Sequence, residues 1–173
     1  NEEGIISPES IKRELRPNTV LVAIQHANNE IGTIQPIRKI ALVLQEYRAI
    51  QKSSNPFLLV DASQSFLYED TSVERLQADI LVLDGIKMYG PRGAGVLFVR
   101  KNVPISPITF GGGQQKGIRP GTENVPAAAG LAMAMEEAVN LRESEVRRLS
   151  EMRNYLIQKI QVELKGAVLN GSS

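Results

Sequence analysis

Hydrophobic and polar positions alternate along the chain in blocks that fit helices and strands in turn. From residue 37, apolar residues recur at helical spacing with charged residues between them: Ile37, Ile40, Ala41, Leu44 and Tyr47. Short apolar runs at residues 20–25, 57–60, 79–83 and 95–100 have the length of buried strands. This alternation predicts an α/β fold with a largely parallel sheet. The last run follows the third too closely for a helical crossover, so we expect that pair to be antiparallel.

The second half of the chain changes character twice. A glycine-rich stretch covers residues 111–124, and a helix rich in alanine is expected from about Val125 to Leu141. Beyond Arg142 the pattern becomes that of a charged amphipathic helix. A change from a buried to a half-exposed helix is typical of a passage between domains. We therefore expect residues 1–141 in one domain and residues 142–173 in a helix leading to a second.

Composition excludes several classes of function. The net charge is +1 and no basic stripe is present, which argues against a nucleic-acid partner. No apolar run is long enough to span a membrane, so we expect neither a membrane partner nor a secreted protein, and a cytoplasmic location by default. The chain has no cysteine and one histidine, which excludes disulfides and predicts no metal site.

Three of the predicted strands run into polar residues. The first is followed by His26, Asn28, Asn29 and Glu30, the second by Asp61, Ser63 and Gln64, and the third by Asp84 and Lys87. Each set alone is ordinary for a turn or a helix cap. In open α/β sheets, however, ligands bind beyond the carboxyl ends of the strands, so the three sets together predict one shared site.

A lysine and an aspartate at one sheet edge suit pyridoxal phosphate. The amine of Lys87 can form an imine with the cofactor aldehyde. The carboxylate of Asp61 can pair with the protonated pyridine nitrogen, so that the ring withdraws electrons from the substrate. Neighbouring amides can bond to the phenolic oxygen of the ring. The cofactor predicted for this edge is pyridoxal 5'-phosphate.

Four motifs make the resemblance specific. HANNEIG, VDASQS, GIKMYGPRGAGVLFV and GGGQQKGIRPGTEN occur in the order and at the spacing of the cysteine desulfurases, in the class V branch of fold-type I pyridoxal-phosphate enzymes. The resemblance runs over nearly the whole chain and is strongest from Leu21 to Asn124. It implies that residues 1–141 form the central part of the cofactor-binding large domain. Residues 142–173 would then be the interdomain helix and the start of the small C-terminal domain.

The resemblance also implies roles for individual residues. Lys87 resembles the catalytic Schiff-base lysine, and Asp61 the partner of the pyridine nitrogen. Gln64 and Asn29 resemble the groups beside the phenolic oxygen. Thr122 matches a threonine that reaches the cofactor phosphate of the other subunit of a homodimer. The implied reaction removes sulfur from L-cysteine, giving L-alanine and an enzyme-bound persulfide for a sulfur-acceptor protein, as in iron-sulfur cluster biosynthesis.

Four positions depart from this pattern or carry a less definite role. The family has a serine and a histidine that hold the phosphate where this chain has Asp84 and Ile86. An ionised aspartate repels phosphate and isoleucine donates nothing, so Asp84 faces away, pairs with a cation such as Arg92, or weakens phosphate binding. Arg119 lies in the same loop as Thr122. His26 is interpreted as a strand-end residue bonded to backbone rather than as a site residue.

Several parts of the resembling enzymes have no counterpart here. Their phosphate-binding helix start and ring-stacking histidine precede the segment that matches Asn1, and their nucleophilic cysteine follows the segment that matches Ser173. We therefore expect an internal fragment that is inactive by itself. Two alternatives stay open: another class V enzyme, such as a selenocysteine lyase or an aminotransferase, and a non-catalytic relative kept as a dimerisation scaffold.

Overall fold

The computed structural model describes residues 2–172, and its elements follow the sequence pattern closely. In chain order they are α1 (Pro8–Glu14), β1 (Leu21–Gln25), α2 (Ile37–Gln51), β2 (Phe57–Asp61), α3 (Val73–Leu76), β3 (Ile80–Asp84), η1 (Gly85–Met88), β4 (Gly95–Val99), η2 (Gln114–Gly117) and α4 (Val125–Glu163). The η elements are single 3₁₀ turns. All four predicted strands are present.

The four strands form one sheet in the order β1-β2-β3-β4. β1, β2 and β3 are parallel, and β4 is antiparallel to β3. In this register Gln25 lies beside Asp61, which in turn lies beside Val82. The predicted mixed α/β fold, mostly parallel with one antiparallel pair, is confirmed.

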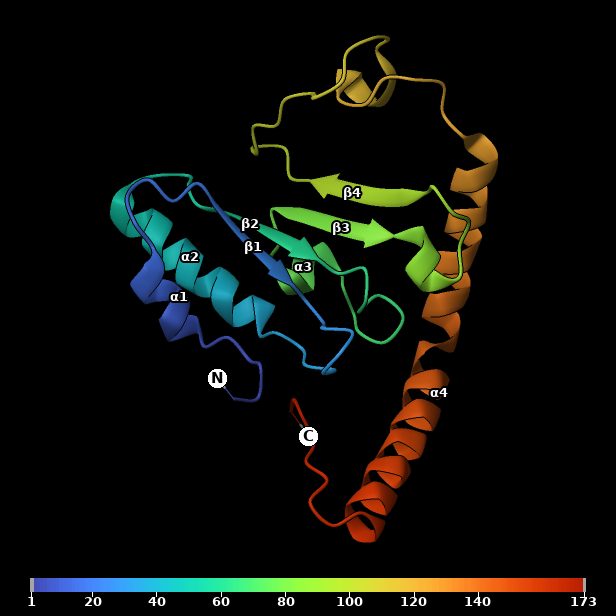
Figure 1. Cartoon of the computed structure of the whole chain (residues 1–173). Helices are drawn as coiled ribbons and strands as arrows, with labels where there is room; N and C mark the ends of the chain where they lie inside the picture. The colour runs from blue at the N-terminus through green and yellow to red at the C-terminus, as the bar shows by residue number, and fades with distance from the viewer. Residues whose placement is uncertain (1, 173) are drawn as a thin grey trace.

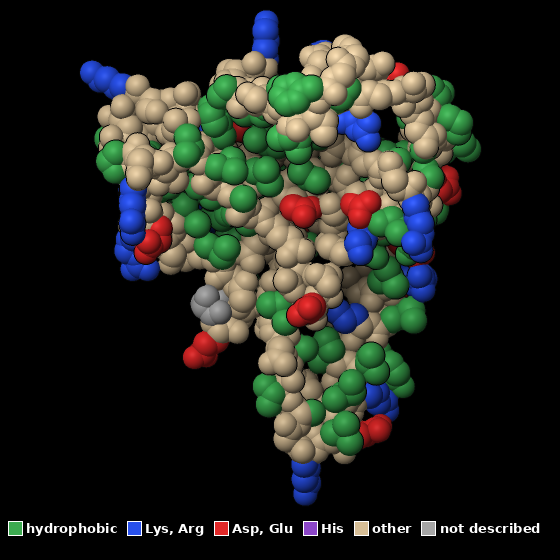
Figure 2. Space-filling view, turned by 45° about the horizontal axis from the view of Figure 1, so that its top comes forward, with side chains coloured by type: hydrophobic (Ala, Val, Ile, Leu, Met, Phe, Trp, Pro, Cys, Tyr) green, Lys and Arg blue, Asp and Glu red, His purple; other side chains and the backbone are tan. Residues whose placement is uncertain are grey.

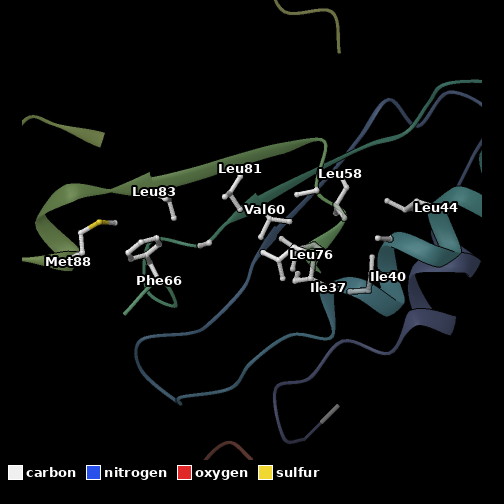
Figure 3. Close-up of a cluster of buried hydrophobic side chains, with 14 of the residues drawn as sticks. Ile37, Ile40, Leu44, Leu58, Val60, Phe66, Leu76, Leu81, Leu83 and Met88 are labelled. Atoms are coloured by element: carbon white, nitrogen blue, oxygen red, sulfur yellow. The ribbon is translucent and has the colours of Figure 1, made fainter. Parts of the chain in front are cut away.

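The hydrophobic core lies on one face of the sheet, beneath α2. In Figure 3, Ile37, Ile40 and Leu44 point from α2 toward the β2 and β3 side chains. The sheet contributes Leu58, Val60, Leu81 and Leu83 to this cluster, and the adjoining segments contribute Phe66, Leu76 and Met88. Each of these residues is at most 7% exposed. The buried residues of α2 lie on the face that packs against the sheet. This packing explains why apolar residues recur at helical spacing in α2.

The opposite face of the sheet is largely open. Strand register places Leu59, Val82 and Leu97 on the same face as Asp61. Leu97 is 56% exposed, and a small cluster of Phe57, Ile80 and Val103 covers only the amino end of this face. In Figure 2, hydrophobic side chains gather in the upper part of the molecule, beneath the loop that crosses its top. Parallel sheets are usually covered on both faces, so this surface is built to be covered.

Helix α4 runs along one side of the molecule as a single 39-residue helix, about 58 Å long at the rise of an α-helix (Figure 1). Ala127 and Leu131 are buried near its start, where it contacts η1. The helix continues unbroken through Arg142, and the domain boundary expected there stays a prediction. No helix of the described residues is long and apolar enough to cross a membrane.

A buried carboxylate ties the amino edge of the sheet together. Asp79 is 5% exposed and precedes β3. Its Oδ2 accepts a hydrogen bond from the backbone N–H of Leu58 (2.8 Å) and forms an ion pair with Arg48 of α2. Its Oδ1 lies 3.8 Å from Nε of Arg100, which follows β4. One side chain therefore links three strands and a helix.

Replacing Asp79 should destabilise the fold. In Asp79→Asn, the Arg48 guanidinium keeps its charge in a site where its side chain is only 20% exposed. Removing one partner of a buried ion pair costs about 3–5 kcal/mol, and we expect about 3 kcal/mol because Arg48 retains some contact with water. Urea unfolding followed by circular dichroism measures this loss.

The matched control is Glu143→Gln, which removes a carboxylate from an ion pair with Arg147 on α4. The Glu143 side chain is 90% exposed, so its loss should change the unfolding free energy by less than about 1 kcal/mol. Equal effects of the two substitutions would show that Asp79 does not hold the sheet together.

Candidate functional site

Asp61 ends β2 and stands on the open face of the sheet. Its Oδ1 accepts a hydrogen bond from the backbone N–H of Ser63 (3.0 Å), which turns the chain away from the strand. No other described residue hydrogen-bonds to this carboxylate. The side chain is half-buried, so it keeps an acceptor oxygen facing a surface that other groups can reach.

Lys87 lies on η1, directly after β3. Residues three apart share a face of a 3₁₀ turn, and here Gly85 and Met88 are the buried pair. Lys87 is therefore directed away from the core and is exposed. Its amine forms no ion pair within residues 2–172.

Asp84 caps the turn that carries Lys87. Its Oδ1 accepts a hydrogen bond from the backbone N–H of Ile86 (3.2 Å). Of the roles considered for Asp84 from sequence, an ion pair with Arg92 is not formed within the described part of the chain. The carboxylate instead orders the start of η1, as aspartate commonly does at helix starts.

A glycine fixes where η1 sits. A Cβ on Gly85 would lie 2.5 Å from the carbonyl oxygen of Ala94 and 3.1 Å from Cδ1 of Leu131. Any side chain there would push η1 away from β4 and from α4, and Lys87 with it. Gly85 is a positioning residue that was not predicted from sequence, although a glycine two residues before the lysine is a visible signal.

The turn after β1 carries Asn29 and is built by its neighbour. The Oδ1 of Asn28 accepts hydrogen bonds from the backbone N–H groups of Glu30 (2.9 Å) and Ile31 (3.1 Å). The N–H of Asn28 donates to the carbonyl of Thr33 (2.9 Å). These bonds close a compact turn, with Asn29 exposed at its tip.

The ends of three adjacent parallel strands thus carry four of the predicted site residues. Asn29 follows β1, Asp61 and Gln64 follow or end β2, and Lys87 follows β3. Gln64 is half-buried in the turn after Asp61. The shared sheet edge was expected from sequence and is present, whereas the role of each residue there stays a prediction.

Comparison with known proteins decides the family. The class-V aminotransferase profile matches residues 1–172. The chain belongs to the class-V aminotransferase family. Enzymes of this family depend on pyridoxal phosphate, whose chemistry an amine and a carboxylate at one sheet edge are suited to serve.

Relatives within the family are named cysteine desulfurases. The chain is 37% identical over 171 residues to cysteine desulfurase IscS of Dictyoglomus turgidum, covering 99% of this chain and 42% of the relative. It is 39% identical over 168 residues to cysteine desulfurase IscS 1 of Archaeoglobus fulgidus, and this match covers 97% of this chain and 42% of the relative. The chain thus spans about two fifths of the length of the curated relatives it matches.

Solved structures of this class-V branch share the fold. A NifS-like protein superposes with a TM-score of 0.83 at 35% identity, covering 91% of this chain and 42% of that one. DndA from Streptomyces lividans gives 0.86 at 32% identity, covering 99% and 47%. SspA in complex with cysteine gives 0.71 at 40% identity, covering 79% and 38%. The arrangement of β1 to β4 and α4 is therefore that of class-V enzymes.

Thr122 is exposed and lies in the loop between β4 and α4, three residues before the helix begins. Because β4 is antiparallel, it ends at the amino edge of the other strands. The loop that follows stands off from the sheet in Figure 1 before it enters α4. Arg119 in this loop donates to the carbonyl of Pro120 (2.7 Å) and has no assigned ligand role. Within residues 2–172 no hydrogen bond or ion pair joins Thr122 or Arg119 to Asp61 or Lys87, so the roles of both loop residues stay predictions.

His26 serves the fold beside the site. It is 5% exposed, and its Nδ1 lies 2.9 Å from the hydroxyl of Ser65, which donates to the carbonyl of Ala62 (3.1 Å). The structural interpretation of His26 holds, but its side-chain partner is a hydroxyl rather than backbone. Sequence could not pair residues 26 and 65, because only the β1–β2 register brings them together. Burial, with a smaller contribution from the Arg75 charge, lowers the pKa of His26.

Lowering the pH should weaken the fold through His26. The unfolded chain takes up a proton near the ordinary histidine pKa of 6.5, whereas the folded chain resists it. Stability contributed by neutral His26 is therefore present above that pH and is lost as the pH falls below it.

Urea unfolding at pH 7.5 and pH 5.5 tests this dependence. We expect a clear drop in the unfolding midpoint for the native chain, and a smaller drop for His26→Gln, which cannot titrate. The same drop in both proteins would assign the pH dependence to other groups.

Proposed function

We propose that this chain forms part of the cofactor site of a pyridoxal-phosphate-dependent cysteine desulfurase. Such an enzyme removes sulfur from L-cysteine and leaves L-alanine. The observation that carries the proposal is that Asp61 ends β2 and Lys87 follows β3, so both lie at the carboxyl ends of adjacent parallel strands. The names of the relatives support the choice of substrate over that of other class-V enzymes.

The side chains at this edge fit the ring of the cofactor. Asp61 offers an acceptor oxygen on the open face, suited to a protonated pyridine nitrogen. Lys87 offers an exposed amine that no described carboxylate occupies, suited to hold the aldehyde end. Asn29 and Gln64 supply amide donors for the phenolic oxygen. When bound, pyridoxal phosphate supplies an electron sink that weakens the bonds at the substrate α-carbon.

Lys87 would also move the proton. Its amine is positioned beside the carboxyl edge by the capped η1 turn, so it can take a proton from the substrate α-carbon and return it at a neighbouring atom. Asp61 would accept a hydrogen bond from the protonated ring nitrogen. In this scheme Asn29 and Gln64 orient the ring rather than move protons.

The side chains at this edge provide fewer groups for the cofactor phosphate than for the ring. Asp84 uses its carboxylate to accept the N–H of Ile86, and neither of these side chains donates a hydrogen bond to an anion. We propose that donors to the phosphate come from elsewhere, among them Thr122 of a second copy in a homodimer. Thr122 is exposed in a loop that stands off from the sheet, so a second copy can reach its hydroxyl, which supports this proposal.

Transfer of the sulfur needs a thiol outside these 173 residues, since the chain has no cysteine. A thiolate attacks the substrate sulfur, the carbon–sulfur bond breaks with its electron pair going to carbon, and a persulfide forms. A sulfur-acceptor protein and a part in iron-sulfur cluster biosynthesis are predictions from the resemblance, and a cytoplasmic location stays the default prediction from composition.

Borohydride trapping tests the cofactor assignment. With added pyridoxal phosphate, we expect visible-range absorbance and, after reduction, cofactor fixed to Lys87, identified by mass spectrometry of the peptide. Lys87→Ala should abolish this label, whereas Lys101→Ala, at an exposed lysine after β4, should retain it. Label spread evenly over exposed lysines would overturn the assignment.

Desulfuration by the chain alone should fail. With L-cysteine and pyridoxal phosphate, we expect alanine and sulfide at the rate of a cofactor-only control, because the chain holds no thiol of its own beside the substrate to take the sulfur. Adding a small thiol should raise the rate in a manner that depends on Lys87. Rapid turnover without any added thiol would contradict the proposed sulfur transfer.

A further inference from the structure

The turn after β1 is held between the two ends of the chain. Its residue Ile31 contacts Gly4 near the N-terminus and Gly171 near the C-terminus. A methyl group on Gly171 would overlap the carbonyl oxygen of Ile31, and one on Gly4 would overlap its Cδ1. In Figure 1 both ends of the chain lie on the same side of the molecule.

Hydrogen bonds within the turn connect the backbone at Ile31 to the loop that contains Asn29. The N–H of Ile31 donates to Oδ1 of Asn28 (3.1 Å), and the N–H of Gly32 donates to the carbonyl of Asn28 (3.1 Å). Asn29 lies inside the loop that these bonds close. A shift of the Ile31 backbone therefore has to move Asn29 or break a bond of the turn.

The C-terminal segment approaches the turn closely at Gly171. Beside it, a cavity of about 310 Å³ separates the turn from α4 and the tail; its lining includes Ile31, Gly32, Ile157, Gln161 and Leu169. The surrounding side chains thus leave space, while the Gly171 backbone lies directly against Ile31. Only a residue without Cβ fits there.

We propose that Gly171 is a positioning residue, which sets the place of Asn29 through its contact with the Ile31 carbonyl. This inference rests on the proposed function for the role of Asn29 beside the cofactor ring. It assigns to the segment after α4 a direct influence on the site edge, although that segment lies about 140 residues further along the chain than Asn29.

Two glycines in the segment after α4 allow the effect of this contact to be distinguished from the effect of backbone strain. Gly171 (φ 96°) and Gly166 (φ 86°) both have left-handed conformations, so alanine strains the backbone at either position. A Cβ on Gly166 would meet nothing within 4 Å. Gly166→Ala is therefore the matched control for Gly171→Ala.

The first measurement needs no cofactor. Amide hydrogen exchange by NMR reports the turn directly: in Gly171→Ala, we expect the amide of Ile31 to exchange about threefold to tenfold faster, as for one lost hydrogen bond. Gly166→Ala should leave this rate unchanged. Unchanged exchange in Gly171→Ala, or equal acceleration in both variants, would overturn the proposal.

A second pair of variants checks the contact from the other side. Gly4→Ala should accelerate the same amide, and Ile31→Val, which removes Cδ1, should restore slow exchange in the double variant. Failure of this rescue would show that Ile31 is not the residue through which the chain ends act on the turn.

The third measurement concerns the role of Asn29. With pyridoxal phosphate bound at Lys87 and left unreduced, the pH titration of the visible absorbance should shift in Gly171→Ala but not in Gly166→Ala, because a bond to the phenolic oxygen is disturbed. If the amide of Ile31 exchanges faster in Gly171→Ala but the pH titration of the absorbance does not shift, the proposed influence of Gly171 on the cofactor ring is wrong. Absence of any Lys87-linked absorbance in the native chain would instead count against the proposed function, and the exchange rates would still decide the positioning contact.

Discussion

Parallel pairing of β1, β2 and β3 places their carboxyl ends side by side, and the arrangement of the candidate site depends on that register. Gln25 lies beside Asp61, and Asp61 beside Val82, so the turns that follow the three strands leave the sheet at one edge. At the opposite edge, Asp79 links β2, α2 and the segment after β4. A buried carboxylate thus holds one end of the sheet in register, and the reactive side chains project from the other.

Each turn at the site edge is ordered by a short polar side chain that accepts backbone N–H groups. Asn28 orders the turn of Asn29, Asp84 the turn of Lys87, and Asp61 the turn of Gln64. Such local bonds let an exposed side chain keep a defined origin without being buried itself. The same logic explains why Asp84 can replace a serine in η1: either side chain can cap the turn, although only serine can donate to a phosphate.

Large surfaces of the chain are built for contacts that its own residues do not supply. The open sheet face exposes Leu97, and the second half of α4 exposes Met152, Tyr155 and Leu156. The chain spans about two fifths of the length of its curated relatives. In the alanine-rich first part of α4, Ala127 and Leu131 are buried and Gly130 lies against Pro91, whereas Ala128, Ala129 and Ala132 are exposed.

The sequence by itself determined the order and type of the elements, the antiparallel β4 and the set of polar strand ends, because apolar spacing and turn residues are local properties. It also carried the motifs that the family match confirms. Only the tertiary structure decided which distant residues meet. The bond between His26 and Ser65 and the contacts of Ile31 with Gly4 and Gly171 depend on strand register and on the path of the segments before β1 and after α4. No local pattern encodes these contacts, since each joins backbone or side-chain atoms whose separation is set by the packing of the whole sheet.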